Sequence, residues 1–327
     1  MKKKDPPFVI TNKILALTAE ISELVGRVAS TEKLSTDPIL RRTNRIRSIQ
    51  ASLAIEQNSL TLDQVTAVLS GKRVLAPPKD IREVKNAYEI YEKLDQLDPF
   101  SLEDLLLAHQ VMMKGLVPEN GEFRSKDVGV VDQKGNILHF GTLPAYVPKL
   151  VYELLEWTRD SNLPMLIRSL VFHYEFELIH PFSDGNGRVG RLWQTLLLSR
   201  WQPLFAWLPI ESIIHNRQEE YYRAFNRSND EGDSTVFVEF MLEAIKSALE
   251  EISKSGGNKT EIRWMRIRDF LSRHDVIMNA DVRELFDVSA ATANRILYGL
   301  CQEGKLVKTR VGKSWGYCVE KQARKNP

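Results

Sequence analysis

The stretch HPFSDGNGRVGR, residues 180–191, decides the fold of this 327-residue chain. Before it, PMLIRSLVFHYEFELI (164–179) places apolar residues at helical spacing behind a first-turn proline, which predicts a buried helix ending near His180. Residues 188–198, RVGRLWQTLLL, resume a helical pattern. Residues 183–187 are therefore expected to form a tight loop that leads into the N-terminus of a second helix. Such a junction is suited to binding an anion, because the helix presents N–H groups there.

The glycines and arginines of this stretch point to a phosphate ligand. Gly185 and Gly187 have no Cβ, so the backbone N–H groups beside them can approach an anion closely. Arg188 and Arg191 are three positions apart on the expected helix and can hold phosphate oxygens from one face. Two arginines favour a ligand with more than one phosphate.

Two further side chains of the stretch supply the chemistry of group transfer. Asp184 offers a hard oxygen ligand of the kind that Mg²⁺ accepts alongside water and substrate phosphates. His180 belongs to the residue type that titrates near neutral pH and can take the proton of an attacking hydroxyl. Taken singly, these residues are also typical of a helix cap and an ordinary turn. Their combination favours phosphoryl or nucleotidyl transfer, whereas a P-loop motif is absent from the sequence and the ligands are too few for catalytic zinc.

The composition is that of an ordinary globular chain, with 43% hydrophobic and 27% charged residues and a net charge of +2. That charge is too small for a polyanion-binding surface over the whole molecule. The start MKKKDPPFVI has no apolar segment and no apolar run approaches the length of a membrane span, so a cytoplasmic protein without membrane contact is expected. Cys301 and Cys318 lie in no metal or disulfide pattern and are expected to be reduced packing residues.

Apart from one hairpin, the first three quarters of the chain predict helices. Helical spacing of apolar residues runs through an N-terminal region, 1–97, and a core region, 98–254. One helix start is marked by a capping box at Thr61 and Gln64. In 128–140, VGVVDQKGNILHF, β-branched residues flank a Lys-Gly-Asn turn and predict a short hairpin.

The order of residues in 180–191 resembles the signature of the Fic family, HPFx[DE]GNGRxxR, and satisfies each of its fixed positions. Further likeness, including GEFR at 121–124, extends over roughly residues 58–249. Fic proteins are mostly helical enzymes that transfer AMP from ATP to a protein hydroxyl, so the resemblance implies this fold and this activity, with ATP as substrate and Mg²⁺ as cofactor. Relatives that transfer phosphate carry a lysine at the position of Gly187, so the glycine favours AMP transfer.

The resemblance also implies a role for each motif residue. His180 would activate a Ser, Thr or Tyr hydroxyl of the target, Phe182 would anchor the loop in the core, and Asp184 would hold Mg²⁺. The phosphates would be bound by Gly185, Asn186, Gly187, Arg188 and Arg191, with Arg191 at the γ-phosphate. The hairpin would be a flap that aligns a target strand through backbone pairing, with docking residues Val128, Val130, Ile137 and Leu138.

Upstream, SLAIEQN at 52–58 resembles the inhibitory helix motif [ST]xxxE[GN] of the family, with Ser52 and Glu56 at the matching positions. Gln57 departs from it, because Gly or Asn is usual there. The resemblance implies that Glu56 pairs with Arg191 at the γ-phosphate position and holds ATP unproductively. A charged hydrogen bond of about 1.5–3 kcal/mol would suppress the active pose about 10- to 150-fold. The alternative for Glu56 is a solvated helix carboxylate.

The C-terminal residues predict a separate small domain. SGGNKT, 255–260, predicts a linker, and 261–327 reads as helix, short helix, turn, helix and two strands, which resembles a winged helix. Basic residues outnumber acidic ones in it. In a DNA reader, the helix after the turn would present Ser289, Thr292, Asn294 and Arg295 to the major groove, and the wing would present Lys308, Arg310 and Lys313 to phosphates. Winged helices also serve as dimerisation or protein-docking modules, so DNA binding and docking both remain open.

The sequence therefore predicts a mainly helical, self-inhibited Fic enzyme that transfers AMP from Mg-ATP to a hydroxyl of a target protein or of itself. Two alternatives remain: a DNA-binding regulator whose Fic core senses nucleotide, and a Fic enzyme that removes AMP, with Glu56 positioning water. Because Glu56 lies on a long helical segment before the core, inhibition within one chain is expected, and a homodimer that exchanges this helix stays open.

Overall fold

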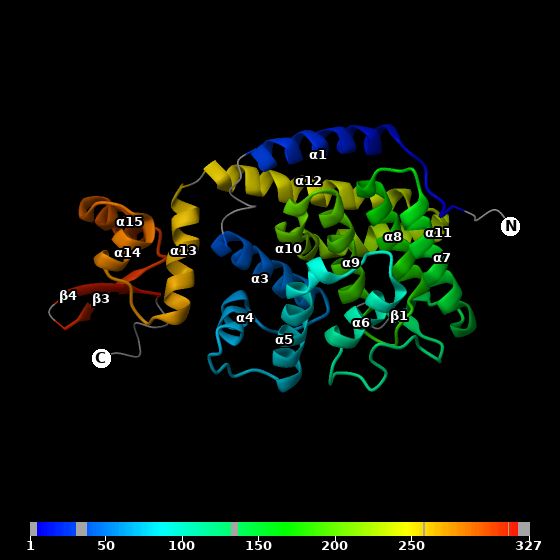
Figure 1. Ribbon diagram of the computed structural model, residues 1–327, viewed down its shortest axis with the longest axis horizontal. Coiled ribbons are helices and arrows are strands. Elements are labelled where there is room, and N and C mark those ends of the chain that lie inside the picture. Colours follow the sequence, from blue (N-terminus) through cyan, green and yellow to red (C-terminus); the bar gives the residue numbers. More distant parts are fainter. Residues whose placement is uncertain (1–4, 31–37, 132–136, 258, 313, 320–327) are drawn as a thin grey trace.

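The computed structural model describes residues 5–30, 38–131, 137–257, 259–312 and 314–319, and helices dominate it (Figure 1). The larger unit contains α1 (Asn12–Ser30), α3 (Pro38–Ile55), α4 (Leu62–Leu69), α5 (Pro78–Glu92), α6 (Leu102–Met112), α7 (Val147–Asp160), α8 (Met165–Ile179), α9 (Asn186–Trp201), α10 (Ile210–Asn216), α11 (Gln218–Glu231) and α12 (Thr235–Gly257). Single 3₁₀ turns lie at Leu94–Gln96, Pro144–Tyr146 and Pro203–Trp207. The predicted mainly helical fold is confirmed.

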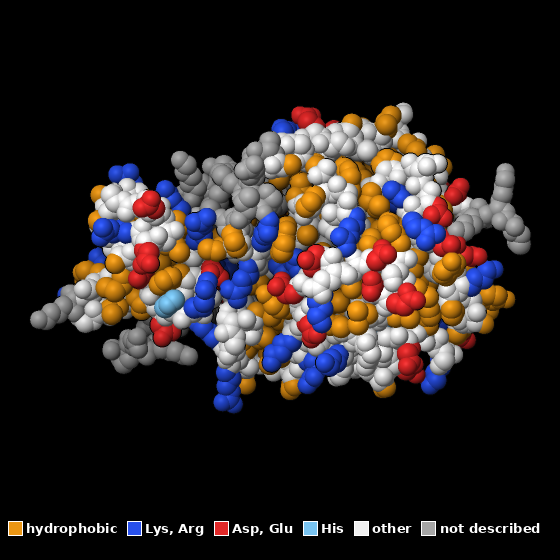
Figure 2. Space-filling view, in the orientation of Figure 1, with side chains coloured by type: hydrophobic (Ala, Val, Ile, Leu, Met, Phe, Trp, Pro, Cys, Tyr) orange, Lys and Arg blue, Asp and Glu red, His pale blue; other side chains and the backbone are white. Residues whose placement is uncertain are grey.

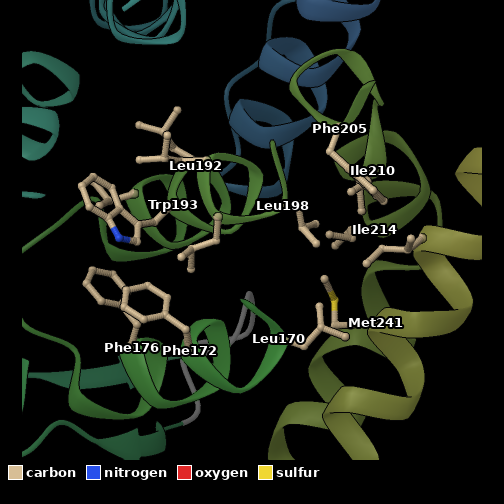
Figure 3. Close-up of a cluster of buried hydrophobic side chains, with 14 of the residues drawn as sticks. Leu170, Phe172, Phe176, Leu192, Trp193, Leu198, Phe205, Ile210, Ile214 and Met241 are labelled. Atoms are coloured by element: carbon tan, nitrogen blue, oxygen red, sulfur yellow. The ribbon is translucent and has the colours of Figure 1, made fainter. Parts of the chain in front are cut away.

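Helix α8 forms the centre of this unit, because it is apolar on nearly all of its faces and must be covered on every side. Its residues Leu170, Phe172 and Phe176 are buried beside Trp193 of α9 and Met241 of α12 (Figure 3). Such a core is packed as densely as a crystal, so α8 and α9 cannot shift independently. The loop that joins them is therefore held firmly at both ends.

The N-terminal helix α1 lies along α12 (Figure 1). The apolar face predicted for it is buried and consists of Ile14, Leu17, Ile21, Leu24 and Val25. Because the helices from α1 to α12 share one continuous hydrophobic core, the division predicted at residue 97 separates two stretches of sequence and not two cores. The capping box predicted at Thr61 and Gln64 is present at the start of α4.

Helix α3 ends at Ile55, one residue before Glu56. Gln57 follows in the left-handed conformation with φ of 67°. The N–H of Asn58 then donates to the carbonyl oxygen of Leu53 at 3.0 Å, which is the bond that closes a helix after a left-handed residue. This conformation explains why the related motif prefers Gly or Asn at the position of Gln57.

Replacing Gln57 with glycine is expected to raise the free energy of unfolding by about 0.5–1 kcal/mol, because glycine adopts a left-handed conformation without the clash of a Cβ. The Gln57 side chain is exposed, so no packing is lost. Urea unfolding followed by circular dichroism measures the change. A Gln57→Ala variant is the matched control and should not gain this stability. A glycine variant less stable than the parent would contradict the prediction.

The C-terminal unit has its own small core. It contains α13 (Lys259–Arg273), α14 (Asn279–Phe286), α15 (Ala290–Gln302), β3 (Val307–Val311) and β4 (Ser314–Cys318). The two strands pair antiparallel, and Ile277 adds one bridge to Tyr317. The core consists of Ile267, Leu271, Ile277, Val282, Ala293, Ile296, Leu297, Leu300 and Leu306. Cys301 and Cys318 are both free thiols, and Cys318 is buried.

The linker predicted at 255–260 is largely helical and the prediction needs correction. Helix α12 continues through Gly257 and α13 begins at Lys259, so α12 and α13 are separated by a single residue. Glycine disfavours a helix by about 1 kcal/mol. Here two glycines lie in the last turn of a 23-residue helix, whose packed residues upstream supply the stability that this turn lacks.

The C-terminal unit contacts helix α3 directly. The guanidinium of Arg42 donates from Nη1 to Oδ1 of Asp269 at 2.9 Å, and Arg268 lies 3.4 Å from Asp63. A cavity of about 460 Å³ between the two units is lined by side chains from both, among them Thr66 and Trp264. The first helix of the C-terminal unit therefore touches the helix that leads to Glu56.

Candidate active site

The stretch 180–191 forms a short loop between α8 and α9. His180 ends α8 in a left-handed conformation, with φ of 52° and ψ of 62°, and its N–H donates to the carbonyl oxygen of Phe176 at 3.0 Å. Gly185 is also left-handed, with φ of 89°, and α9 begins at Asn186. The loop is therefore shorter than the predicted 183–187 at its C-terminal end, because Asn186 and Gly187 already belong to the first turn of α9.

Asn186 holds the loop in shape. Its Oδ1 accepts a hydrogen bond from the N–H of Phe182, and its Nδ2 donates to the carbonyl oxygen of Phe182, both at 2.8 Å. Asn186 is 2% exposed and Phe182 is fully buried. Asn186 is also one of the predicted phosphate-binding residues, and in this structure each end of its side-chain amide makes a bond within the loop. Its backbone N–H still lies in the first turn of α9.

His109 on α6 supports this loop, although the sequence did not predict a role for it. Its ring stacks on Phe182 with centroids 3.7 Å apart, and its Nδ1 accepts from the N–H of Gly121 at 2.9 Å. With Nδ1 accepting, Nε2 carries the proton and donates to the carbonyl oxygen of Asp184 at 3.0 Å. In the sequence, His109 lies in a helix with several other polar residues, and no pattern separates it from an ordinary core histidine.

Burial lowers the pKa of His109 from 6.5 to about 4, against a smaller raising effect of its bond to Asp184. A lowered pKa in the folded state gives stability that is present above pH 6.5 and is lost as the pH falls towards 4. Replacing His109 with Phe is therefore expected to reduce the loss of unfolding free energy between pH 6.5 and pH 4 by up to about 3 kcal/mol. The substitution should also lower the unfolding free energy at pH 7, because the hydrogen bonds of His109 are lost. Urea unfolding at pH 7, 5.5 and 4 measures this. Equal acid slopes for parent and variant would contradict it.

Arg124, the arginine of GEFR, fixes the backbone around His180. Its Nε donates to the carbonyl oxygen of His180 at 2.6 Å, its Nη1 donates to that of Lys126 at 2.8 Å, and its Nη2 bonds the carbonyl oxygen of Thr142. Arg124 is 3% exposed, and burial lowers its pKa. One side chain thus ties the end of α8 to both ends of the hairpin segment.

The predicted flap lies beside His180. Strands β1 (Gly129–Val131) and β2 (Ile137–Phe140) pair antiparallel, so Val130 and Leu138 lie in the paired strands as predicted. The N–H of Gly141 donates to the carbonyl oxygen of Val128 at 3.0 Å, which continues the pairing. The Lys-Gly-Asn turn predicted at 134–136 lies outside the described residues.

Asp184 and Arg188 form an ion pair at the mouth of the loop. Nη2 of Arg188 lies 2.7 Å from Oδ1 of Asp184, which also accepts from the N–H of Gly185 at 2.6 Å. The Asp184 side chain is 46% exposed, so its carboxylate can present an oxygen to a cation that keeps waters and phosphate ligands, as Mg²⁺ does. Among the described residues, no group of three or more His, Cys, Asp or Glu side chains is placed to hold a metal ion.

Arg191 and Glu56 form the second ion pair of the site, as predicted, and Ser52 adds a neutral hydrogen bond to the same guanidinium. Arg191 donates from Nη2 to Oε1 of Glu56 at 2.8 Å and from Nε to Oγ of Ser52 at 2.9 Å. Burial lowers the pKa of Arg191, but the nearby Glu56 carboxylate outweighs it and the pKa is raised. A Cβ at Gly187 would overlap Oε1 of Glu56, so a larger residue at this position would force the end of the Glu56 side chain to shift.

Comparison with known proteins identifies this arrangement. The Fic/DOC family model matches residues 99–198. A probable protein adenylyltransferase of Aquifex aeolicus is 30% identical over 72% of this chain and 70% of its own length. The crystal structure of a Fic family protein from Desulfovibrio desulfuricans is 41% identical, covers 97% of this chain and 98% of its own, and superposes with a TM-score of 0.76. The chain belongs to the Fic/DOC family.

The chain spans less than half the length of some of the curated relatives that it matches. The protein adenylyltransferase of Caenorhabditis elegans is 29% identical over 64% of this chain, which corresponds to only 43% of the worm protein's length. The solved structure of that worm protein, at 23% identity and a TM-score of 0.61, shares the fold. Within the described residues, no helix has both the length and the apolar character needed to cross a membrane.

The DNA-contact residues predicted for this Fic protein are spread over two elements. Ser289 caps α15 as predicted, and Thr292, Asn294 and Arg295 follow on its first turns. Asn294 accepts a hydrogen bond from Asn279 at 2.6 Å, and Lys308 and Arg310 project from β3. Lys313 lies outside the described residues. Figure 2 shows basic side chains interspersed with acidic and hydrophobic ones, which fits the net charge of +2.

Proposed function

We propose that this Fic protein is a protein adenylyltransferase that transfers AMP from Mg-ATP to a Ser, Thr or Tyr hydroxyl. One observation carries the proposal: the turn between α8 and α9 presents His180, Asp184 and Arg188 beside an α9 N-terminus that is rigidly held. The relatives named protein adenylyltransferase support the same activity.

The reaction assigns one job to each part of the site. The target hydroxyl oxygen attacks the α-phosphorus, the bond from that phosphorus to the bridging oxygen of the β-phosphate breaks, and pyrophosphate leaves. His180 takes the hydroxyl proton. Backbone N–H groups at the start of α9 and the Arg188 guanidinium stabilise the phosphates as charge develops on them. Asp184 would hold Mg²⁺, which supplies positive charge to the phosphate oxygens.

The hairpin β1–β2 would bring the target into place. An extended target segment could pair with a hairpin strand through backbone hydrogen bonds, which selects an extended backbone and demands little of the target's sequence. Because Arg124 bonds the backbone at both ends of the hairpin segment and at His180, a target paired there would lie next to the base.

We further propose that Glu56 inhibits this activity within its own chain. Arg191 would bind the γ-phosphate, and the carboxylate of Glu56 lies on its Nη2 at 2.8 Å. The γ-phosphate and Glu56 would therefore compete for one guanidinium. Both residues belong to the same polypeptide, so a partner molecule is not needed to form the pair.

Labelled ATP tests the activity and identifies the group that is transferred. The Glu56→Gly variant is incubated with Mg²⁺ and with ATP labelled at either the α- or the γ-phosphate, and label on protein is scored after denaturing electrophoresis. AMP transfer predicts label from the α-position alone, together with pyrophosphate release. Label from the γ-position would show phosphate transfer instead, and no label from either would remove the support for group transfer.

A second role, DNA binding through the C-terminal unit, is favoured by one feature of its hairpin. Trp315 is 49% exposed, and the charged heads of Lys308 and Arg310 lie 4.3 and 4.7 Å from its ring centroid. An exposed aromatic ring between two cations suits contacts with a phosphate backbone. Binding of a mixed-sequence duplex that weakens as salt rises would support this role. No binding at low salt would favour protein docking.

A further inference from the structure

We infer that Glu83 on α5 is a positioning residue that joins the phosphate-binding arginine to the inhibitory turn. This inference rests on the proposed function and deepens it. Glu83 is 5% exposed, although a carboxylate is seldom buried unless it is paired. Its two oxygens serve two different parts of the site: Oε1 accepts from Nη1 of Arg188 at 3.1 Å, and Oε2 accepts from Nδ2 of Asn58 at 2.7 Å.

The first arm of Glu83, its bond through Oε1 to Arg188, orients the Arg188 guanidinium. Arg188 is 3% exposed, and its guanidinium is bonded from two sides, by Glu83 at Nη1 and by Asp184 at Nη2. The buried Nε of Arg188 has no hydrogen-bond partner among the described residues. With its fork anchored by two carboxylates, the plane of the guanidinium is set before any nucleotide arrives. A pre-oriented arginine binds phosphate more tightly, because less side-chain freedom is lost on binding.

The second arm of Glu83, its bond through Oε2 to Asn58, holds the inhibitory turn, residues 56–58. Asn58 lies two residues after Glu56 and is 8% exposed. Its Oδ1 accepts from the N–H of Leu60 at 3.1 Å, and its own N–H closes the end of α3 on Leu53. Two carboxylates of α5 fasten this turn: Asp80 accepts from the N–H of Ser59 at 3.0 Å, and Glu83 bonds Asn58 and, through Arg188, connects the turn to α9. The turn that places Glu56 on Arg191 is anchored on its far side by Glu83.

The two arms predict different effects, which separate variants can measure. Asn58→Ala removes the second arm, together with the bonds of the Asn58 side chain to the carbonyl oxygen of Asp80 at 3.2 Å and to the N–H of Leu60. The turn therefore loosens and inhibition weakens, raising AMP transfer about 3- to 10-fold in the otherwise unchanged chain. In a Glu56→Gly chain the same substitution should change nothing, because no inhibition remains to be weakened. If Asn58 only stabilised the fold, its substitution would lower the rate of AMP transfer both in the parent chain and in the Glu56→Gly chain.

Glu83→Gln in the Glu56→Gly chain tests the first arm. Loss of the charged anchor is expected to weaken ATP binding about 10-fold, seen as a raised Kd in calorimetry and a raised KM with kcat little changed. Glu89→Gln is the matched control, because Glu89 lies on the same helix and pairs with the exposed Lys93 at 3.0 Å. The thermal unfolding midpoint of each variant shows that the fold is retained.

The outcomes separate this inference from the proposed function. An unchanged Kd for ATP in Glu83→Gln, or equal effects of Asn58→Ala in both backgrounds, would overturn the inference while leaving AMP transfer intact. Calorimetry needs no turnover, so a weaker Kd in Glu83→Gln would support the first arm even if the labelling experiment showed no transfer. Failure of the Glu56→Gly chain to bind ATP at all would overturn both.

Discussion

Replacing His180 with alanine in the Glu56→Gly chain is expected to lower the rate of AMP transfer by about 10²–10⁴-fold, the usual contribution of a general base. The side chain's Nδ1 lies 3.3 Å from the carbonyl oxygen of Glu177. A carbonyl can only accept, so Nδ1 carries the proton in this contact and Nε2 is the basic nitrogen. Arg124 bonds the His180 carbonyl, which fixes the backbone from which the ring projects.

The His180→Ala substitution should lower kcat and leave the Kd for ATP nearly unchanged. His180 precedes the phosphate-binding turn, and Asn186 and His109 hold that turn in shape. Calorimetry with ATP and single-turnover transfer rates, measured on the same preparation, separate the two quantities. His180→Asn is the polar control and should be as slow as His180→Ala. An alanine variant that transfers AMP at the parent rate would contradict the assignment of His180 as the base.

Replacing Glu56 with glycine is expected to raise AMP transfer about 10- to 150-fold, which is the range set by one charged hydrogen bond. Arg191 is 3% exposed and its guanidinium is held by Glu56 and Ser52 together. Without the Glu56 carboxylate, the buried positive charge of Arg191 would have less compensation. A γ-phosphate that takes the position of this carboxylate would therefore bind the Arg191 guanidinium strongly.

Graded variants sharpen this test. Glu56→Gln keeps the shape and one hydrogen bond but removes the charge, so its transfer rate should lie between those of the parent and Glu56→Gly. Ser52→Ala removes one bond to Nε of Arg191 and should activate less than either. The initial rate of labelling from α-labelled ATP measures all of them. A Glu56→Gly rate no higher than that of the parent would contradict inhibition and favour the reading in which Glu56 positions water to remove AMP.

Local patterns in the sequence determined most of the helices and much of the site. The periodicity of α1, the capping box at Thr61 and the end of α8 at His180 all follow from residues a few positions apart, and each is observed. The spacing of Ser52 and Glu56, one helical turn apart, places both on the face that meets Arg191. Such features depend on short-range sterics and hydrogen bonds, which do not need the rest of the chain.

The tertiary structure alone decided which groups meet across the chain. His109 reaches Asp184, and Glu83 joins Asn58 to Arg188, through contacts between residues far apart in sequence. A buried polar group must find a partner wherever packing places one, and that partner is set by how α5, α6 and α9 are packed.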